Sequence, residues 1–121
     1  MKILVIEDNL DLKEILDYIL KDDGHEVIPC SDGSSLNSLD IIKPDLILMD
    51  EILAGSRGSA LCRRLKKDEA TMHIPVILIS AMPNLKEIAA ECGADAYIEK
   101  PFSIDTLVEI INVRYNKADI S

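Results

Sequence analysis

The sequence predicts a three-layer α/β fold, in which helices cover both faces of a parallel β-sheet. Short, largely apolar segments alternate with segments whose apolar residues recur at helical spacing, and this alternation occurs five times within 121 residues. Apolar runs without polar alternation are typical of strands that are buried on both faces. A repeated strand–helix order indicates a parallel sheet with right-handed crossovers.

The length of the chain corresponds to one domain. We therefore expect a single domain over residues 1–121, with an ordered core at about residues 2–115. The residues after about Tyr115 are polar, and we expect a short frayed tail there. No linker pattern interrupts the chain, which favours a stand-alone protein.

Five strands are predicted. Three of them are solidly apolar and two are weaker: Ile3–Ile6, Leu46–Met49 and Val76–Ile79, then Glu26–Cys30 and Ala96–Ile98. Because proline has no N–H to donate to a neighbouring strand, Pro29 predicts that its strand lies at an edge of the sheet.

Five helices are predicted from apolar stripes with a period of three to four residues. The stripes comprise Leu12, Ile15, Leu16 and Ile19; Leu36 and Leu39; Leu61 and Leu65; Leu85, Ile88 and Ala89; and Leu107, Ile110 and Ile111. Gly24 and Gly93 are expected to end the first and fourth helices, and Pro44 follows the end of the second. Ser103 is a candidate N-cap for the last helix.

The charge balance excludes some classes of partner. The chain has 13 Lys and Arg against 22 Asp and Glu, a formal net charge of −9. Such a surface repels phosphate backbones and anionic lipids, so we expect no direct binding to nucleic acid or membranes. No apolar stretch approaches the roughly 20 residues that span a bilayer. Cations and basic partners are favoured instead.

The cysteines indicate a cytoplasmic protein. Cys30, Cys62 and Cys92 are widely spaced, odd in number and far in sequence from either histidine. We interpret them as reduced thiols, with a metal or disulfide role as the alternative.

Acidic side chains follow the predicted strands. Ligands of an open parallel sheet bind beyond the carboxyl ends of its strands. The residues at these ends are Glu7-Asp8, Asp50-Glu51, Ser80-Ala81 and Glu99-Lys100-Pro101. Three of these acids (Glu7, Asp8 and Asp50), the hydroxyl of Ser80 and Lys100 should therefore meet at one edge of the sheet.

This group of side chains suits Mg²⁺ and phosphate. Two like charges about 4 Å apart repel by about 4 kcal/mol at an effective dielectric constant near 20, so Glu7, Asp8 and Asp50 need compensation. Mg²⁺ prefers carboxylate and phosphate oxygens, and Lys100 adds a positive charge suited to phosphate. A carboxylate in this setting can attack a phosphoryl group and become an aspartyl phosphate. Asp50 is the best candidate because it ends the central strand.

The same residues resemble the receiver domain of two-component response regulators. The resemblance rests on Glu7-Asp8, Asp50, Ser80-Ala81 and Lys100-Pro101-Phe102 in this order, and it covers about residues 2–115. It implies a doubly wound, flavodoxin-like sheet with strand order 2-1-3-4-5 and five flanking helices.

The resemblance also implies roles for single residues. Asp50 would accept a phosphoryl group from a sensor histidine kinase or a histidine phosphotransfer protein. Asp8, Glu7, Asp50 and the main-chain carbonyl of Ile52 would bind Mg²⁺. Ser80, Ala81 and Lys100 would contact the phosphoryl group, Tyr97 would be the aromatic switch residue, and Pro101 would follow a cis peptide bond.

The family resemblance implies a switch rather than a turnover enzyme. The protein would promote its own phosphorylation and dephosphorylation and present a changed face to a downstream protein target, in some relatives as a phosphorylation-dependent dimer.

The sequence departs from the family pattern in three places. Ala54 stands where proline is common, which predicts a more mobile loop, and the fourth helix should be short or shifted. Ile52 and Met82, which flank the phosphorylation site in the family, are both apolar. Apolar groups cannot orient an attacking water, so we predict slow autodephosphorylation.

Three alternative functions stay open. A receiver-like module could bind partners without being phosphorylated. A Mg²⁺-dependent aspartyl phosphatase resembling haloacid dehalogenases would need a second acid two residues after its nucleophile, where this chain has Ile52. A flavin mononucleotide carrier would need a hydroxyl- and glycine-rich loop after the first strand, where this chain has Glu7-Asp8-Asn9-Leu10-Asp11.

Overall fold

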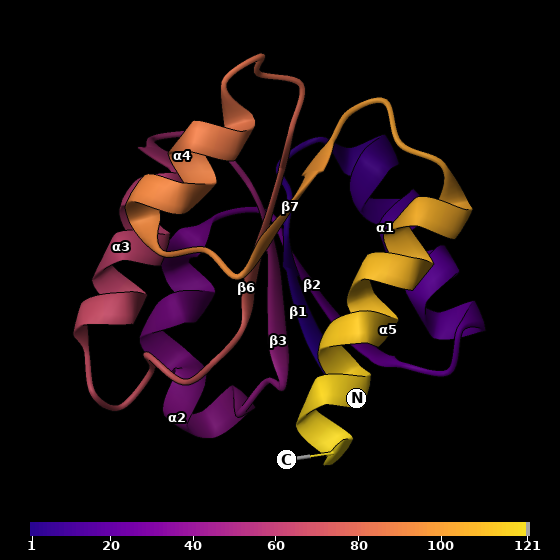
Figure 1. Ribbon diagram of the computed structural model, residues 1–121, viewed down its shortest axis with the longest axis horizontal. Helices are drawn as coiled ribbons and strands as arrows, with labels where there is room; N and C mark the ends of the chain where they lie inside the picture. Colours follow the sequence, from indigo (N-terminus) through magenta and orange to yellow (C-terminus); the bar gives the residue numbers. More distant parts are fainter. Residues whose placement is uncertain (121) are drawn as a thin grey trace.

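A parallel sheet of five strands forms the centre of the computed structural model, which describes the fold of residues 1–120 and the side chains of residues 1–113 (Figure 1). The strand order is β2-β1-β3-β6-β7. The bounds are β1 Lys2–Ile6, β2 Glu26–Cys30, β3 Leu46–Asp50, β6 Val76–Ser80 and β7 Ala96–Glu99. Counted along the chain, these are strands 2-1-3-4-5 of a doubly wound sheet, so the predicted order and the edge position of the Pro29 strand are confirmed.

Helices cover both faces of this sheet. Their bounds are α1 Leu10–Asp22, η1 Gly33–Ser38 (a 3₁₀ helix), α2 Leu39–Ile42, α3 Gly58–Lys67, α4 Leu85–Cys92 and α5 Ile104–Ile120. Helices α1 and α5 lie on one face, and α2, α3 and α4 lie on the other (Figure 1).

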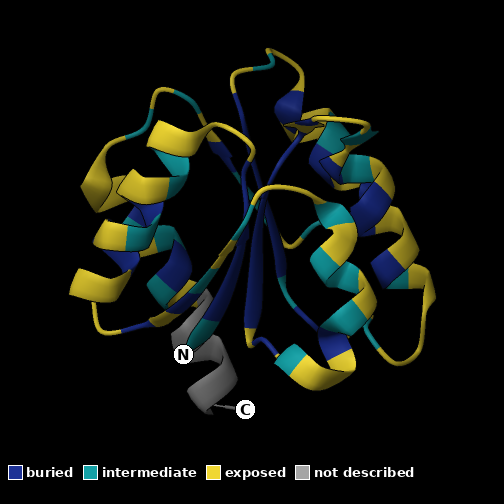
Figure 2. Ribbon diagram, turned by 180° about the vertical axis from the view of Figure 1, so that it is seen from behind, coloured by how far each residue is buried: buried dark blue, intermediate teal, exposed yellow. Residues whose placement is uncertain are grey.

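Two apolar clusters hold these layers together, one on each face of the sheet. Leu4 and Met49 face the cluster that α3 and α4 cover, whereas Val5 and Leu48 face the cluster under α1 and α5. Because successive residues of a strand point to opposite faces, a strand between two helical layers must be apolar at every position. The central strands β1, β3 and β6 are accordingly buried along most of their length, whereas the edge strands β2 and β7 are only partly buried (Figure 2).

Local signals in the sequence fix several helix ends. Asn9 is the N-cap of α1, and its Oδ1 accepts a hydrogen bond from the N–H of Leu12. Ser103 Oγ accepts from the N–H of Thr106, which confirms Ser103 as the cap of α5. Gly24 and Gly93 have φ values of 93° and 79°, a backbone region that glycine enters without steric cost.

The structure differs from the predicted elements in three places. The second predicted helix is mostly the 3₁₀ helix η1, and only four residues of α2 are α-helical. A two-stranded hairpin, β4 Ile52–Leu53 and β5 Ser56–Arg57, lies in the loop where mobility was expected. Helix α5 continues to Ile120 because the residues after Tyr115 include no glycine or proline; Ser121 lies outside the described residues.

Two further predictions concern the thiols and the membrane. All three cysteines are free, and burial next to Cys92 raises the pKa of the Cys62 thiol to about 12. A thiol with so high a pKa stays protonated and unreactive. Within the described part of the chain, no helix has both the length and the apolar character needed to cross a bilayer.

Candidate functional site

The register of the sheet brings the predicted site residues to one edge. Met49 of β3 pairs with Ile6 of β1, so Asp50 lies beside the Glu7-Asp8 pair that follows β1. Ser80 of β6 pairs with Glu99 of β7, which places Ser80 next to the strand that leads into Lys100. Residues far apart in the sequence thus meet because parallel strands all end at the same edge.

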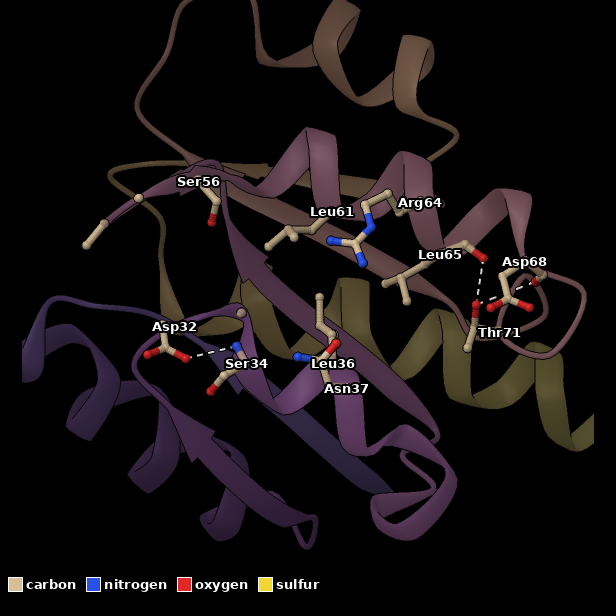
Figure 3. Close-up of a pocket in the computed structure, with 13 residues that line it drawn as sticks. Asp32, Ser34, Leu36, Asn37, Ser56, Leu61, Arg64, Leu65, Asp68 and Thr71 are labelled. Atoms are coloured by element: carbon tan, nitrogen blue, oxygen red, sulfur yellow. Dashed lines mark hydrogen bonds between the residues drawn. The ribbon is translucent and has the colours of Figure 1, made fainter.

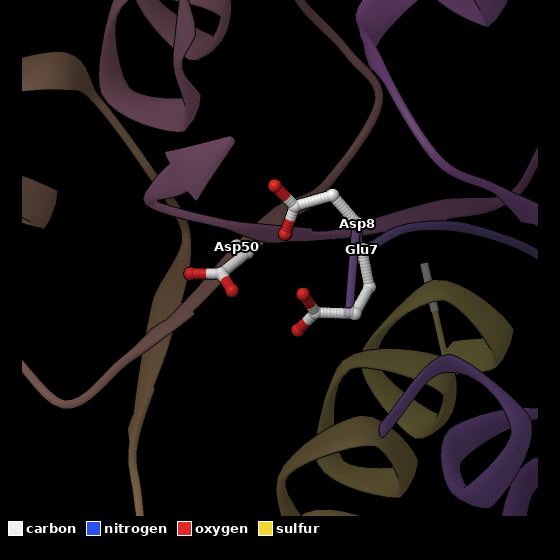
Figure 4. Close-up of side chains that lie close together, drawn as sticks. All are labelled: Glu7, Asp8 and Asp50. Carbon is white, nitrogen blue, oxygen red and sulfur yellow. The ribbon is translucent and has the colours of Figure 1, made fainter. Parts of the chain in front are cut away.

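Three carboxylates form the centre of the site. One oxygen from each of Glu7, Asp8 and Asp50 lies within 4.8 Å of the other two, and Figure 4 shows their side chains pointing toward one another. Glu7 and Asp50 are buried, whereas Asp8 is exposed. Burial, together with the nearby charge of Asp50, raises the pKa of Glu7 above its ordinary value.

This donor set fits Mg²⁺. All three groups offer hard carboxylate oxygens, and the exposed side of Asp8 leaves room for the waters that Mg²⁺ usually keeps. Burial, and to a smaller extent the neighbouring Asp50, disfavour the ionised form of Glu7 and raise its pKa, and a bound cation would offset both effects.

Lys100 supplies the positive charge of the site. Its Nζ lies 2.9 Å from Asp50 Oδ2 and 3.3 Å from Glu7 Oε1. Burial alone would lower the pKa of this lysine, but the hydrogen bonds and charges of Asp50 and Glu7 outweigh burial and hold its pKa above the ordinary value. Lys100 is therefore fully charged at neutral pH. Its peptide bond to Pro101 is cis, as predicted.

The segment after Asp50 donates backbone hydrogen bonds to the site. The N–H of Ile52 donates to Asp50 Oδ1 at 3.1 Å, and the N–H of Ala54 donates to Asp8 Oδ2 at 3.0 Å. The expected mobile loop is thus a hairpin tied to two of the three acids. The side chain of Ile52 is 51% exposed.

The remaining predicted residues lie around this centre. Ser80 is buried, and its Oγ accepts a hydrogen bond from the N–H of Met82 at 3.3 Å. Ala81 follows it and is exposed. Tyr97 is half-buried in β7 and packs against the apolar cluster on the α3 and α4 side. Ser80 follows Ile79, the residue that pairs with Asp50, whereas Tyr97 pairs with Leu78 further back along the sheet; the roles of all three residues stay predictions.

Sequence reasoning did not assign a role to Glu51, although it is as buried as Glu7. Its carboxylate accepts hydrogen bonds from the N–H and Oγ of Ser59, and Arg57 Nη1 lies 3.7 Å away. Gly58 is a second residue without a predicted role, and a Cβ there would overlap the carbonyl oxygen of Asp50. The sequence shows only that an acid follows the candidate nucleophile, and no local pattern signals that Glu51 is buried or that it contacts Ser59.

A groove lies apart from the three clustered carboxylates. An open groove of about 560 Å³ runs between η1 and α3, and none of the three clustered carboxylates lines it (Figure 3). Arg64, Asp32 and Asp68 border it, so its rim carries charges of both signs. This mixture favours no single class of charged ligand.

Comparison with known proteins agrees with the site. The family model for the response regulator receiver domain matches residues 3–112. The chain is 38% identical over 109 residues to the phosphate regulon transcriptional regulatory protein PhoB of Pseudomonas aeruginosa, covering 88% of this chain and 48% of PhoB. It is 32% identical over 121 residues to the DNA-binding response regulator MtrA of Mycobacterium tuberculosis, covering 98% of this chain and 52% of MtrA. The chain thus spans about half the length of these curated relatives.

Solved structures give the same result. The signal receiver domain of a signal transduction histidine kinase from Syntrophus aciditrophicus superimposes with a TM-score of 0.89 at 32% identity, over 96% of this chain and 90% of that chain. The receiver domain of sensor histidine kinase PA1611 from Pseudomonas aeruginosa, which has a magnesium ion coordinated in its active site cleft, gives a TM-score of 0.81 at 28% identity, over 90% of this chain and 92% of that chain. The chain belongs to the response regulator receiver domain family.

Proposed function

We propose that this chain is a phosphorylation-dependent switch in which Asp50 accepts a phosphoryl group from a phosphohistidine of a sensor histidine kinase or a phosphotransfer protein. One observation carries the proposal: the Asp50 carboxylate, at the end of the central strand, contacts the Lys100 ammonium at 2.9 Å beside two further carboxylates. A nucleophile, a cation and metal ligands are thereby gathered in one place.

The proposed transfer forms one bond and breaks one bond. A carboxylate oxygen of Asp50 attacks phosphorus, and an acyl phosphate forms. The P–N bond to the donor histidine breaks, and its electron pair goes to the imidazole nitrogen. In this proposal Lys100, whose Nζ contacts Asp50 Oδ2 at 2.9 Å, pairs with one phosphoryl oxygen, and the hydroxyl of Ser80, the residue after the register partner of Asp50, donates to another.

Receiver domains bind Mg²⁺, and in this chain the ion would be held by Asp8, Asp50, the main-chain carbonyl of Ile52 and Glu7, directly or through water. When bound, Mg²⁺ supplies charge neutralisation for the transferring phosphoryl group. Between transfers, Lys100 and the N–H groups of Ile52 and Ala54 hold the carboxylates apart and oriented.

The output of the switch is proposed to be a protein contact. Tyr97, β7 and the adjoining faces of α4 and α5 border an apolar groove of about 520 Å³. A shift of the Ser80 hydroxyl toward a phosphoryl oxygen would release its bond to Met82 and change the loop that leads into α4. Tyr97 is the residue through which this change would reach the groove.

The test is the intact mass of the protein after incubation with Mg²⁺ and acetyl phosphate. We expect one added phosphoryl group, absent when Mg²⁺ is chelated and absent from Asp50→Asn. Asp68→Asn, which alters an exposed acid at the far end of α3, is the matched control and should be phosphorylated like the wild type.

Two results would count against the proposal. An adduct that persists in Asp50→Asn would move the acceptor to another residue. No adduct with acetyl phosphate or with a phosphohistidine donor would favour a receiver that binds partners without being phosphorylated.

A further inference from the structure

A buried carboxylate lies directly behind the phosphorylation site. Glu51 is 1% exposed, although glutamate is rarely buried unless its charge is satisfied. Its Oε1 accepts from the N–H of Ser59 at 2.6 Å, and its Oε2 accepts from Ser59 Oγ at 2.9 Å. Arg57 Nη1 lies 3.7 Å from Oε2. The charge of Glu51 is therefore matched by donors that all come from the start of α3 and the strand before it.

These contacts replace a missing helix cap. The first N–H groups of a helix have no partner within it and normally bond to a side chain at the N-cap. The N-cap of α3 is Arg57, which makes no such bond. Glu51, seven residues before the helix, supplies the acceptor instead, and its negative charge faces the positive end of the helix dipole.

The same residue closes the loop that it precedes. The N–H of Gly58 donates to the backbone oxygen of Glu51 at 2.9 Å, so the backbone and the side chain of Glu51 both contact the first turn of α3. Gly58 permits this approach because a Cβ there would overlap the carbonyl oxygen of Asp50. The hairpin between these two points is held at its base.

This hairpin supports two of the three site carboxylates. Within it, the N–H of Ile52 donates to Asp50 Oδ1 and the N–H of Ala54 donates to Asp8 Oδ2. Both donors are backbone groups, so their positions depend on how the hairpin is anchored. Glu51 therefore anchors the hairpin at a position next to Asp50, and the same hairpin carries the N–H groups of Ile52 and Ala54 that orient Asp50 and Asp8.

We propose that Glu51 is a positioning residue of the phosphorylation site: by capping α3 from outside the helix, it fixes the hairpin whose backbone N–H groups hold Asp50 and Asp8 in place for Mg²⁺ and phosphoryl transfer. This inference rests on the proposed function. It predicts that Glu51 acts on the site through geometry rather than by touching the phosphoryl group. Loss of the cap should weaken Mg²⁺ binding even when the protein remains folded.

The experiment compares Glu51→Ala, Glu51→Gln and Asp68→Ala with the wild type. Asp68→Ala is the matched control because Asp68 Oδ1 accepts from the N–H of Ala70 just beyond the opposite end of α3. Three quantities are measured: the Mg²⁺ dissociation constant by calorimetry, the rate of phosphorylation by acetyl phosphate, and the exchange rates of the Ile52 and Ala54 amide hydrogens in Mg²⁺-free protein. Urea titrations show that each variant is folded.

We expect Glu51→Ala to weaken Mg²⁺ binding and to slow phosphorylation by about tenfold each, the lower end of what groups that orient metal ligands contribute. The two amide hydrogens should exchange at least about tenfold faster, because the hairpin opens more often. Glu51→Gln keeps an oxygen that accepts from the N–H of Ser59. Its Mg²⁺ affinity, phosphorylation rate and amide exchange rates should therefore lie close to those of the wild type. Asp68→Ala should leave all three quantities within about twofold of the wild type.

Unchanged exchange at Ile52 and Ala54 in folded Glu51→Ala would overturn the inference, as would faster exchange with unchanged Mg²⁺ affinity. In either case Glu51 would be only a structural cap. A wild-type protein that neither binds Mg²⁺ nor becomes phosphorylated would instead refute the proposed function. The amide exchange rates would still show in that case whether Glu51 fixes the hairpin.

Discussion

Replacing Lys100 with methionine should lower the free energy of unfolding by about 2–3 kcal/mol at neutral pH in the absence of Mg²⁺. Methionine keeps the apolar stem of the side chain and removes its charge. The ammonium lies 2.9 Å from Asp50 and 3.3 Å from Glu7, and both carboxylates are buried. In the variant these two carboxylates face each other and Asp8 without a cation.

The magnitude follows from opposing terms. At an effective dielectric constant near 20, each contact of the ammonium is worth about 5–6 kcal/mol of attraction. Partial burial of the ammonium costs several kcal/mol, and the 24% exposure of the Lys100 side chain allows water to screen both contacts. We therefore expect a net loss of about 2–3 kcal/mol, somewhat below the roughly 3–5 kcal/mol lost when one partner of a fully buried ion pair is removed, and a shift of about 2 M in the urea midpoint.

The pH dependence has a definite sign. Burial and the charge of Asp50 raise the pKa of Glu7, so ionisation of Glu7 costs stability as the pH rises through its folded-state value. Without Lys100 this cost grows, and the difference between the variant and the wild type should therefore shrink as the pH falls. The raised pKa of Lys100 means that its contribution is complete at neutral pH and is lost only at strongly alkaline pH.

Urea titrations of wild type and Lys100→Met, with and without Mg²⁺, test this prediction. Lys67→Met, which removes an exposed lysine of α3, is the control and should shift the midpoint little. Mg²⁺ at about 100 times its dissociation constant adds about 2.7 kcal/mol of stability, so it should raise the variant to about the stability of the wild type without Mg²⁺. Equal midpoints for Lys100→Met and the wild type without Mg²⁺, or a variant that Mg²⁺ does not stabilise, would contradict this prediction.

Three further predictions concern residues near Lys100 and Asp50. Gly58→Ala should lower the free energy of unfolding by about 2–3 kcal/mol in urea titrations, because its Cβ overlaps the Asp50 carbonyl oxygen and must displace the hairpin; wild-type stability would contradict this. The Mg²⁺ affinity should fall as the pH is lowered, and the fall should begin at a higher pH than for an ordinary glutamate, because burial and the neighbouring Asp50 raise the pKa of Glu7. Calorimetry of Glu7→Gln should show a weaker dependence on pH, and an equal dependence would remove Glu7 from the metal site. Phosphorylated protein should lose its phosphoryl group slowly, because the apolar side chains of Ile52 and Met82 cannot orient an attacking water. Ile52→Asn should shorten the lifetime of the phosphorylated protein, as measured by intact mass. A wild-type lifetime of seconds would contradict the prediction of slow autodephosphorylation.

The sheet could be predicted because its signals lie within single segments of sequence. Short apolar runs such as Leu46–Met49 are typical of strands between two layers, and Pro29 indicates that its strand lies at an edge. The convergence of Asp50 and Lys100 was predictable from topology alone, since parallel strands end at one edge. The structure adds the distances between these groups and shows which atoms are hydrogen-bonded to each other.

Other features depend on contacts that no local pattern encodes. The strands β4 and β5 have two residues each, which is too short for any periodicity to show. The Glu51 carboxylate accepts a hydrogen bond from Ser59 across a hairpin, and no residue pattern between the two indicates that the Glu51 side chain points toward α3. The 3₁₀ helix η1 follows from an Asp32 side chain that accepts from the N–H of Ser34, a choice between turn types that an apolar stripe does not resolve.

The most direct test of the central claim locates the phosphoryl group on a residue. Protein treated with Mg²⁺ and a small phosphodonor is reduced with borohydride, which converts an aspartyl phosphate to homoserine, and the peptides are sequenced by tandem mass spectrometry. We expect homoserine at position 50 and at no other acid of the site. Homoserine at position 8, or an unmodified Asp50 in protein whose intact mass shows the adduct, would contradict it.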